Sequence, residues 1–228
     1  MNPRLAVVAC ITVLGLGLVA RMAAADVPPA VNEVRSYEGF EHALSLNWNY
    51  QDIDVAQPLA SPSSPLSVGR GATAGFGLTY FQKLGSSSNW FLNAGGSYDL
   101  GSSKDVFVGS VPFTDKVSIR SWSGEVGLGY LVPLTSKAFA YARGDAFYSS
   151  TTGSFDFSGA TSATRDSQPW KVFGAEKAFG GGVRIAPRIN LYGETYSQFG
   201  WGSVSDGRSE HRETVKYGCY RGGLMRSF

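Results

Sequence analysis

Few side chains in this 228-residue chain have the types and spacing that catalysis or metal binding requires. The two histidines are His42 and His211, and the second lies in the polar run Ser209-Glu210-His211-Arg212-Glu213. Serine, histidine and a carboxylate can supply a nucleophile, a base and an orienting acid. Successive residues of one polar loop rarely meet as a triad, so we expect no catalytic residue and no enzyme. Two distant histidines and the lone Cys219 lack metal-ligand spacing, so we expect neither a metal site nor a cofactor.

A second group of chemically active side chains consists of charges that share one parity of alternating segments. An isolated charge in a confined interior is costly, so such charges must pair or stay hydrated. We interpret these charges as a salt-bridge and hydrogen-bond network that fills the interior enclosed by the alternating segments. The alternative is that they form the selectivity filter of a narrow pore. The predicted network comprises Glu125, Arg143, Asp145, Glu176, Arg184, Glu194 and Arg221.

Alternation of apolar and polar residues predicts the strands that must position these charges. In residues 42–51, Leu44, Leu46 and Trp48 share one face, and the residues between them are polar. The same period of two predicts eight strands, with polar or glycine-rich faces that could not fill the core of a sandwich. The predicted strands are residues 42–51, 68–82, 89–100, 117–132, 138–149, 170–185, 188–201 and 216–228.

The predicted connections alternate in length. Residues 83–88, 133–137 and 186–187 form short connections. The long connections are rich in Ser, Gly, Pro and Asp and cover residues 53–67, 101–116, 150–169 and 202–212. Alternating apolar residues in 106–113 and 155–157 could extend the strands or, less favoured, add two strands to make ten.

The first 25 residues have the pattern of a cleaved export signal. Arg4 precedes an apolar run over residues 5–20, and Ala23-Ala24-Ala25 offers the small residues that a signal peptidase reads. Loss of Arg4 and Arg21 with this segment leaves 18 basic and 18 acidic residues, so the formal charge falls from +2 to zero. No dense basic patch indicates a nucleic-acid partner. Residues 26–40 match no strand pattern and form a predicted leader before the first predicted strand.

The signal peptide, the eight strands, the alternating connections and the terminal Phe228 together resemble the small OmpA/OmpX-type outer-membrane β-barrels of Gram-negative bacteria. The resemblance covers residues 41–228 and implies an all-β fold, a closed antiparallel transmembrane barrel with short periplasmic turns and long external loops. It also implies that the barrel-assembly machinery reads the last strand, with Tyr220, Leu224 and Phe228 as the signal. We therefore expect the bacterial outer membrane as the location.

Outward aromatic residues near the strand ends are predicted to form two girdles at the bilayer surfaces. Together the two girdles comprise Trp48, Tyr50, Tyr80, Trp90, Tyr98, Trp122, Tyr130 and Trp201. The expected partners are outer-membrane lipids and lipopolysaccharide, the assembly machinery, and a host or envelope ligand at the external loops. A structural or surface-interaction role is the favoured function. The alternatives are a porin-like channel for ions or small solutes and a lipid A-modifying enzyme, for which His211 would be the first residue to test.

Overall fold

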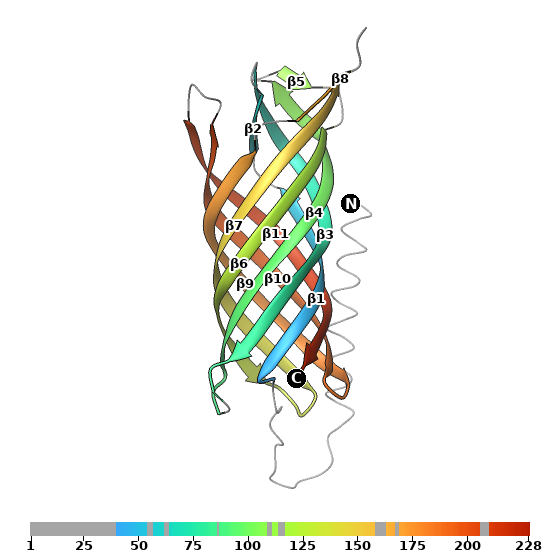
Figure 1. Ribbon diagram of the computed structural model, residues 1–228, viewed down its shortest axis with the longest axis vertical. Helices are drawn as coiled ribbons and strands as arrows, with labels where there is room; N and C mark the ends of the chain where they lie inside the picture. The colour runs from blue at the N-terminus through green and yellow to red at the C-terminus, as the bar shows by residue number, and fades with distance from the viewer. Residues whose placement is uncertain are drawn as a thin grey trace.

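The computed structural model describes residues 40–53, 57–61, 64–85, 87–108, 111–113, 117–157, 163–166, 169–205 and 210–228. These residues form one closed antiparallel β-barrel, as Figure 1 shows. Among them, no helix is long and apolar enough to cross a membrane. The predicted signal peptide and residues 26–39 of the leader lie outside the described residues and stay predictions.

Eight long strands close the barrel, as the alternation predicted, and a barrel of ten strands does not form. Each long strand pairs with its neighbour along the chain, and the first pairs with the last. The long strands are β1 (His42–Ile53), β3 (Ser64–Lys83), β4 (Trp90–Val108), β6 (Val117–Pro133), β7 (Ala138–Phe157), β9 (Trp170–Ala186), β10 (Ile189–Ser205) and β11 (Glu210–Ser227). Three short strands, β2 (Gln57–Ser61), β5 (Val111–Phe113) and β8 (Ala163–Asp166), pair with β3, β4 and β7.

The strand pairing is staggered by ten residues round the barrel. A path of paired residues that leaves β1 at His42 returns to β1 at Asp52; it passes through Gln82, Leu92, Leu128, Gly144, Lys177, Ser197 and Gly218. In a closed barrel such a stagger tilts the strands by roughly 40°. Eight strands at this tilt leave a bore just wide enough for side chains to fill.

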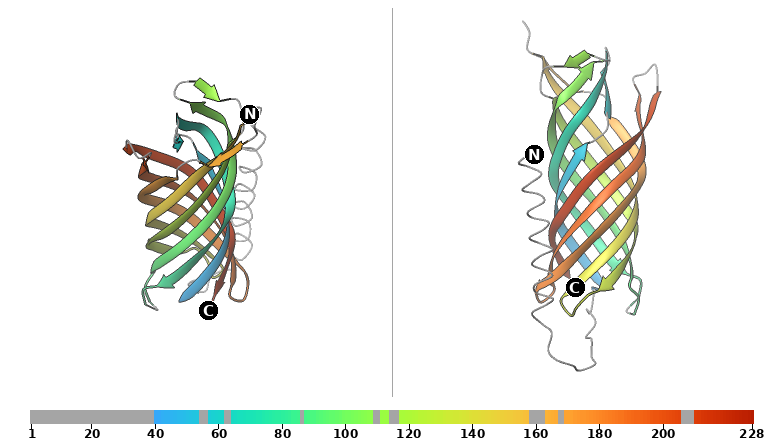
Figure 2. Two further views of the ribbon diagram at one scale, coloured as in Figure 1. Left: turned by 45° about the horizontal axis from the view of Figure 1, so that its top comes forward. Right: turned by 180° about the vertical axis from the view of Figure 1, so that it is seen from behind.

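The predicted long loops are largely β-structure: the extension considered for 106–113 and 155–157 is present in β4, β5 and β7, and the bounds of the other long loops are corrected. β3 and β7 have 20 residues each and β4 has 19, whereas a strand needs about 9–11 residues to cross a bilayer. The strands therefore continue beyond a membrane at one end, the upper end in Figures 1 and 2. Above a bilayer both faces of a strand meet water, so the apolar–polar contrast that marks the membrane-spanning part disappears.

Inward-facing glycines give the large rings inside the barrel their space. A Cβ atom on Gly129 would lie 2.2 Å from the ring of Phe91, and one on Gly182 would lie 2.6 Å from the ring of Phe139. Gly202 lies equally close against Trp170, which is fully buried. The narrow bore thus pairs a ring on one strand with a glycine on the next.

The outer face of the barrel carries a belt of exposed apolar side chains. Trp48, Phe76, Tyr98 and Trp122 are register partners on four successive strands, so they form one continuous aromatic row. The eight predicted girdle residues all lie on this outer face: Tyr50 and Tyr80 are half-buried, and the other six are exposed. A continuous apolar belt round a closed barrel suits the hydrocarbon region of a bilayer.

Lys177 is an exception within this belt. It is exposed on β9 between the exposed Phe173 and Phe179, and its Nζ lies 5.3 Å from the ring centroid of Phe199. A lipid-facing lysine costs about 2–4 kcal/mol at the bilayer midplane and less toward the surface. We expect Lys177→Leu to raise the free energy of unfolding in phospholipid vesicles by about 1–3 kcal/mol.

Urea unfolding followed by tryptophan fluorescence measures this change. Lys137→Leu, an exposed lysine in the turn between β6 and β7, is the matched control and should change stability by less than about 0.5 kcal/mol. Equal effects of the two substitutions would mean that Lys177 does not face lipid.

Candidate functional site

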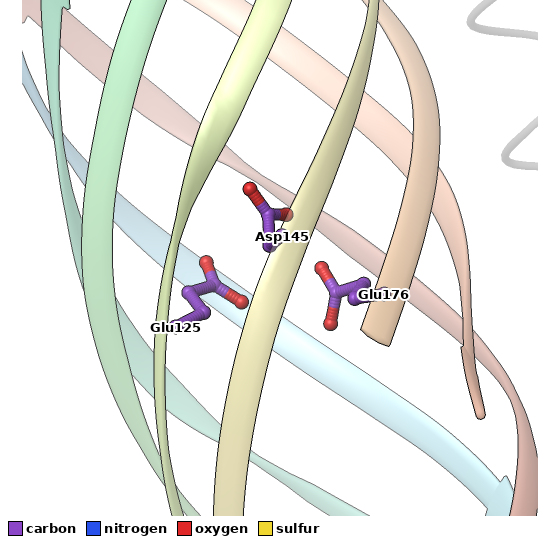
Figure 3. A group of neighbouring side chains, drawn as sticks. All are labelled: Glu125, Asp145 and Glu176. Atoms are coloured by element: carbon purple, nitrogen blue, oxygen red, sulfur yellow. The ribbon is translucent and has the colours of Figure 1, made fainter. Parts of the chain in front are cut away.

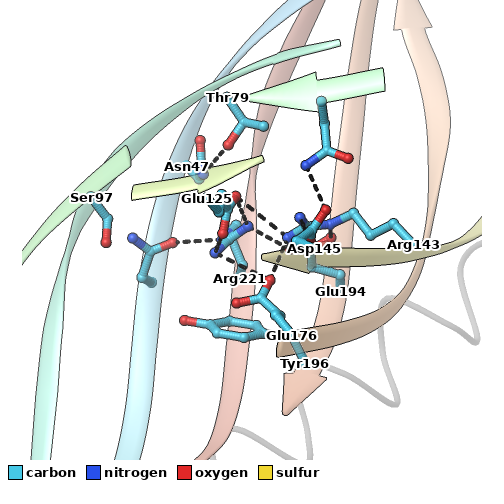
Figure 4. A network of polar contacts seen from close by, with 12 residues as sticks. Asn47, Thr79, Ser97, Glu125, Arg143, Asp145, Glu176, Glu194, Tyr196 and Arg221 are labelled. Carbon is cyan, nitrogen blue, oxygen red and sulfur yellow. Dashed lines mark hydrogen bonds and ion pairs between the residues drawn. The ribbon is translucent and has the colours of Figure 1, made fainter. Parts of the chain in front are cut away.

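Arg143 is the centre of a charged layer inside the barrel (Figure 4). Its Nη2 donates to Glu176 Oε1 and to Glu194 Oε1, each at 2.8 Å, and its Nη1 donates to Asp145. Glu125 is a more distant partner at 3.5 Å. The guanidinium is completely buried, so these carboxylates replace the water that it loses. Such burial is tolerated only where hydrogen bonds and opposite charges surround the ion.

Arg221, from β11, is the second cation of this layer. Its two terminal nitrogens donate to the two oxygens of Glu125 at 2.7 and 2.8 Å, a bidentate arrangement. Nη1 also lies 2.9 Å from Glu194 Oε1, and the guanidinium carbon lies 4.6 Å from the ring centroid of Tyr196. Glu194 therefore bridges both arginines, so the charges form one network across the bore.

The structure brings six of the seven predicted network residues into contact, and Arg184 is the exception. Arg184 lies eight residues from Glu176 on β9, roughly 26 Å along the strand. It is half-buried near the end of β9, where its backbone N–H donates to the carbonyl of Lys137 at 2.7 Å. Parity predicted its inward side but carried no information about its height in the barrel.

Polar residues that the predicted network lacked complete this layer. Tyr141 Oη donates to Glu194 at 2.6 Å, and Asn93 Nδ2 donates to Asp145 at 2.9 Å. Asp99 is fully buried and close enough to Arg221 to interact with it electrostatically. Each has the inward parity of its strand, so a complete list of inward polar residues would have included them. Within this layer, five carboxylates (Asp99, Glu125, Asp145, Glu176 and Glu194) meet two guanidinium groups.

Three of these carboxylates also have the spacing of metal ligands. Oxygens of Glu125, Asp145 and Glu176 lie within 4.8 Å of one another (Figure 3). Arg143 contacts all three. A cation would have to displace the guanidinium, so we assign the cluster to the ion-pair network.

An aromatic layer, which the sequence reasoning missed, fills the barrel next to the charged layer. Phe40 packs edge-on against Phe81 and Phe91 at centroid distances of 5.8 and 6.0 Å, although it was predicted as the last residue of the leader. The layer consists of Phe40, Ala43, Phe81, Phe91, Leu131, Phe139, Tyr141, Tyr192 and Met225. These residues lie close to the short turns and have inward parity. Their grouping was detectable from parity combined with distance from each turn.

A second apolar group lies inside the barrel toward the end with the long connections. Val117, Ile119, Phe147, Trp170 and Val172 are each at most 1% exposed. They come from β6, β7 and β9, so they cover one wall of the bore. The charged layer thus lies between two apolar groups.

The chain terminus closes the seam between β1 and β11. The backbone N–H of Phe228 donates to the carbonyl of His42 at 3.0 Å, and its ring stacks on the His42 imidazole at a centroid distance of 6.2 Å. His42 Nδ1 is hydrogen-bonded to Tyr80 Oη at 2.6 Å. These contacts give His42 a structural role at the end of the barrel that carries the short turns. Tyr220 and Leu224, the other predicted signal residues, are exposed on the outer face of β11.

Deleting Phe228 removes the last seam hydrogen bond and the ring on His42. We expect the deletion variant to accumulate unassembled, with much less heat-modifiable protein in the outer membrane than wild type. Quantitative immunoblotting of membrane fractions measures this, and Phe228→Tyr is the matched control that keeps the ring. Assembly of the deletion variant at the wild-type level would contradict the assigned signal.

The catalytic alternative that centres on His211 stays untested, because its side chains lie outside the described residues. Ser209 lies outside the described residues, and so does the side chain of His211. The backbone of His211 pairs with Val204 on β10. Cys219 is a free, buried thiol on the inner face of β11.

No family model and no curated protein matches the sequence. A solved structure shares the fold. The chain is similar to the outer-membrane protein OprG from Pseudomonas aeruginosa, with 12% identity, a TM-score of 0.54 and coverage of 86% of this chain and 99% of OprG. Weaker matches include neisserial surface protein A (10% identity, TM-score 0.48, covering 82% of this chain and 97% of that one). Another is Ail of Yersinia pestis (13% identity, TM-score 0.41, covering 82% and 99%).

Sequence identities this low support a shared fold and no inference about function. The closed barrel, its apolar belt and the likeness to OprG agree with the predicted outer-membrane location. The chain has the fold of the small eight-stranded outer-membrane β-barrels.

Proposed function

We propose that the chain is a closed, non-conducting outer-membrane barrel that acts through its external end. The charged layer carries this proposal, because Arg143 and Arg221 join carboxylates from β6, β7, β9 and β10 across the bore. The aromatic layer beside it excludes water on the side of the short turns. An ion crossing the barrel would have to break the network and pass between packed rings. An eight-stranded barrel leaves little room for either.

The external end supports a role in surface contact. Strands of 17–20 residues raise the barrel well above the bilayer, which about 9–11 residues cross. β2 pairs with β3 along its whole length and also contacts β9 and β10, which are on the other side of the barrel. This crossing covers part of the external mouth. Binding residues are often carried on a protein scaffold that projects from the surface, and this β-structured end is such a scaffold. A ligand among host or envelope molecules is therefore the proposed partner, and catalysis is not part of the proposal.

Single-channel recording in planar bilayers tests the proposal. We expect the refolded mature protein to produce no discrete current steps, with folding verified by heat-modifiable migration and a wide-bore porin as the positive control. Reproducible, ion-selective steps would reject the closed barrel. They would favour the channel alternative, with the charged layer as its filter.

A further inference from the structure

A shallow groove lies on the outer wall of the barrel where β4, β6 and β7 run side by side. It has a volume of about 290 Å³, and its lining includes Tyr98, Arg120, Trp122, Ser150 and Thr152. Trp122 is the register partner of both Tyr98 and Ser150, and Arg120 pairs with Thr152. The groove thus joins two aromatic rings, a guanidinium and two hydroxyl groups within two neighbouring registers.

The exposed fractions of these residues show which of them form the walls of the groove and which form its floor. Tyr98 and Trp122 are about half exposed, at 52% and 50%. Ser150 is only 8% exposed although it is the register partner of the outward Trp122. Lys171 on β9 is exposed and is the register partner of Ser150, so a second cation lies beside the groove.

The apolar belt sets the height of the groove. On β6, exposed Val132, Leu128 and Val126 lie below Trp122 on the same face. Ten residues separate Val132 from Trp122, or roughly 25 Å of height at a tilt of about 40°. The apolar band of an outer-membrane barrel is also about 25 Å tall. Trp122 therefore lies at the outer boundary of the hydrocarbon, and Arg120 lies one outward residue further, at the depth of lipid headgroups.

We propose that this groove binds the phosphorylated sugar headgroup of an outer-leaflet glycolipid. The guanidinium of Arg120 has the fork geometry that matches phosphate, and Lys171 adds a second positive charge. The hydroxyls of Ser150 and Thr152 donate to sugar or phosphate oxygens. The rings of Tyr98 and Trp122 pack against the sugar and the first acyl carbons. This assignment rests on the outer-membrane orientation in the proposed function and does not depend on whether the bore conducts.

The test is native mass spectrometry of the refolded mature protein titrated with diphosphorylated lipid A in detergent. Charge-assisted hydrogen bonds contribute about 1.5–3 kcal/mol, so Arg120→Gln should weaken lipid A binding by about tenfold or more. Lys137→Gln, in the turn at the other end of the barrel, is the charge-matched control and should bind as wild type does. Lipid A without its phosphates should bind wild type as weakly as lipid A binds Arg120→Gln.

Three outcomes would overturn the proposal. One is equal binding by wild type and Arg120→Gln, and another is equal binding of phosphorylated and phosphate-free lipid A. The third is full competition by inorganic phosphate at the lipid concentration, which would show a site for a free anion instead of a lipid. Each outcome is independent of the channel recordings, because a closed barrel can lack the lipid site and a conducting barrel can have it.

Discussion

Arg143→Ala is expected to lower the free energy of unfolding by about 3–5 kcal/mol, the usual cost of leaving buried charges without their partner. Asp145 loses the only ion pair described for it, and Glu176 loses its 2.8 Å contact and keeps Arg221 at 3.9 Å. Glu194 retains Arg221 and the hydroxyl of Tyr141. A single truncation therefore leaves a group of carboxylates that one remaining arginine must neutralise.

The excess of carboxylates predicts an asymmetry between the two charge types. Glu176→Gln keeps the shape of the side chain and the acceptor oxygen for Arg143, and it removes one of five carboxylates that meet two arginines. We expect it to cost much less than Arg143→Ala, about 1 kcal/mol or below. Urea unfolding in phospholipid vesicles, followed by tryptophan fluorescence, compares the two variants. Equal losses of stability would mean that carboxylate repulsion is not what Arg143 relieves.

The sequence was sufficient to predict the wall of this barrel and only part of its interior. Alternation placed Glu125, Glu176 and Glu194 on the inner face, and the structure joins them to Arg143 and Arg221. Alternation shows whether a residue faces the inside or the outside of the barrel. It does not show the height of the residue along the barrel axis, because that height depends on the stagger between strands. That stagger becomes visible only once the pairing of all eight strands is known.

The aromatic layer escaped prediction for a related reason. Phe91 and Gly129 lie on different strands and become neighbours through the register of β4 with β6. In the sequence, Phe91 interrupts the apolar alternation of its segment, and Gly129 is one glycine among many. The large ring and the glycine indicate close packing only when the two residues are known to be neighbours. Alternating apolar residues in 106–113 and 155–157 did indicate strand extensions, and β4, β5 and β7 contain them; the remaining extensions lack such alternation and were missed.

Gly129→Leu is expected to destabilise the barrel strongly, because its side chain would point into the packed interior. A Cβ atom at this position would lie 2.2 Å from the Phe91 ring, and Phe91 is only 2% exposed and packs against Phe81 and Tyr141. Overpacking a rigid interior usually costs about 1–3 kcal/mol, and the walls of a closed barrel cannot separate without breaking hydrogen bonds. Gly124→Leu on the same strand is the matched control. Its side chain would face lipid, and the nearest atom to its Cβ is 3.8 Å away.

Replacing the ring should relieve the clash. Phe91→Ala alone is expected to cost about 3–5 kcal/mol because it leaves a cavity beside Phe81 and Tyr141. In the double variant, the leucine on Gly129 fills part of that cavity. The two losses should therefore combine to less than their sum by at least about 2 kcal/mol, a coupling that a double-mutant cycle measures. Additive losses would show that the ring and the glycine do not share space. Equal costs of leucine at Gly124 and Gly129 would contradict the inner and outer faces assigned to β6, and with them the aromatic layer that closes the bore.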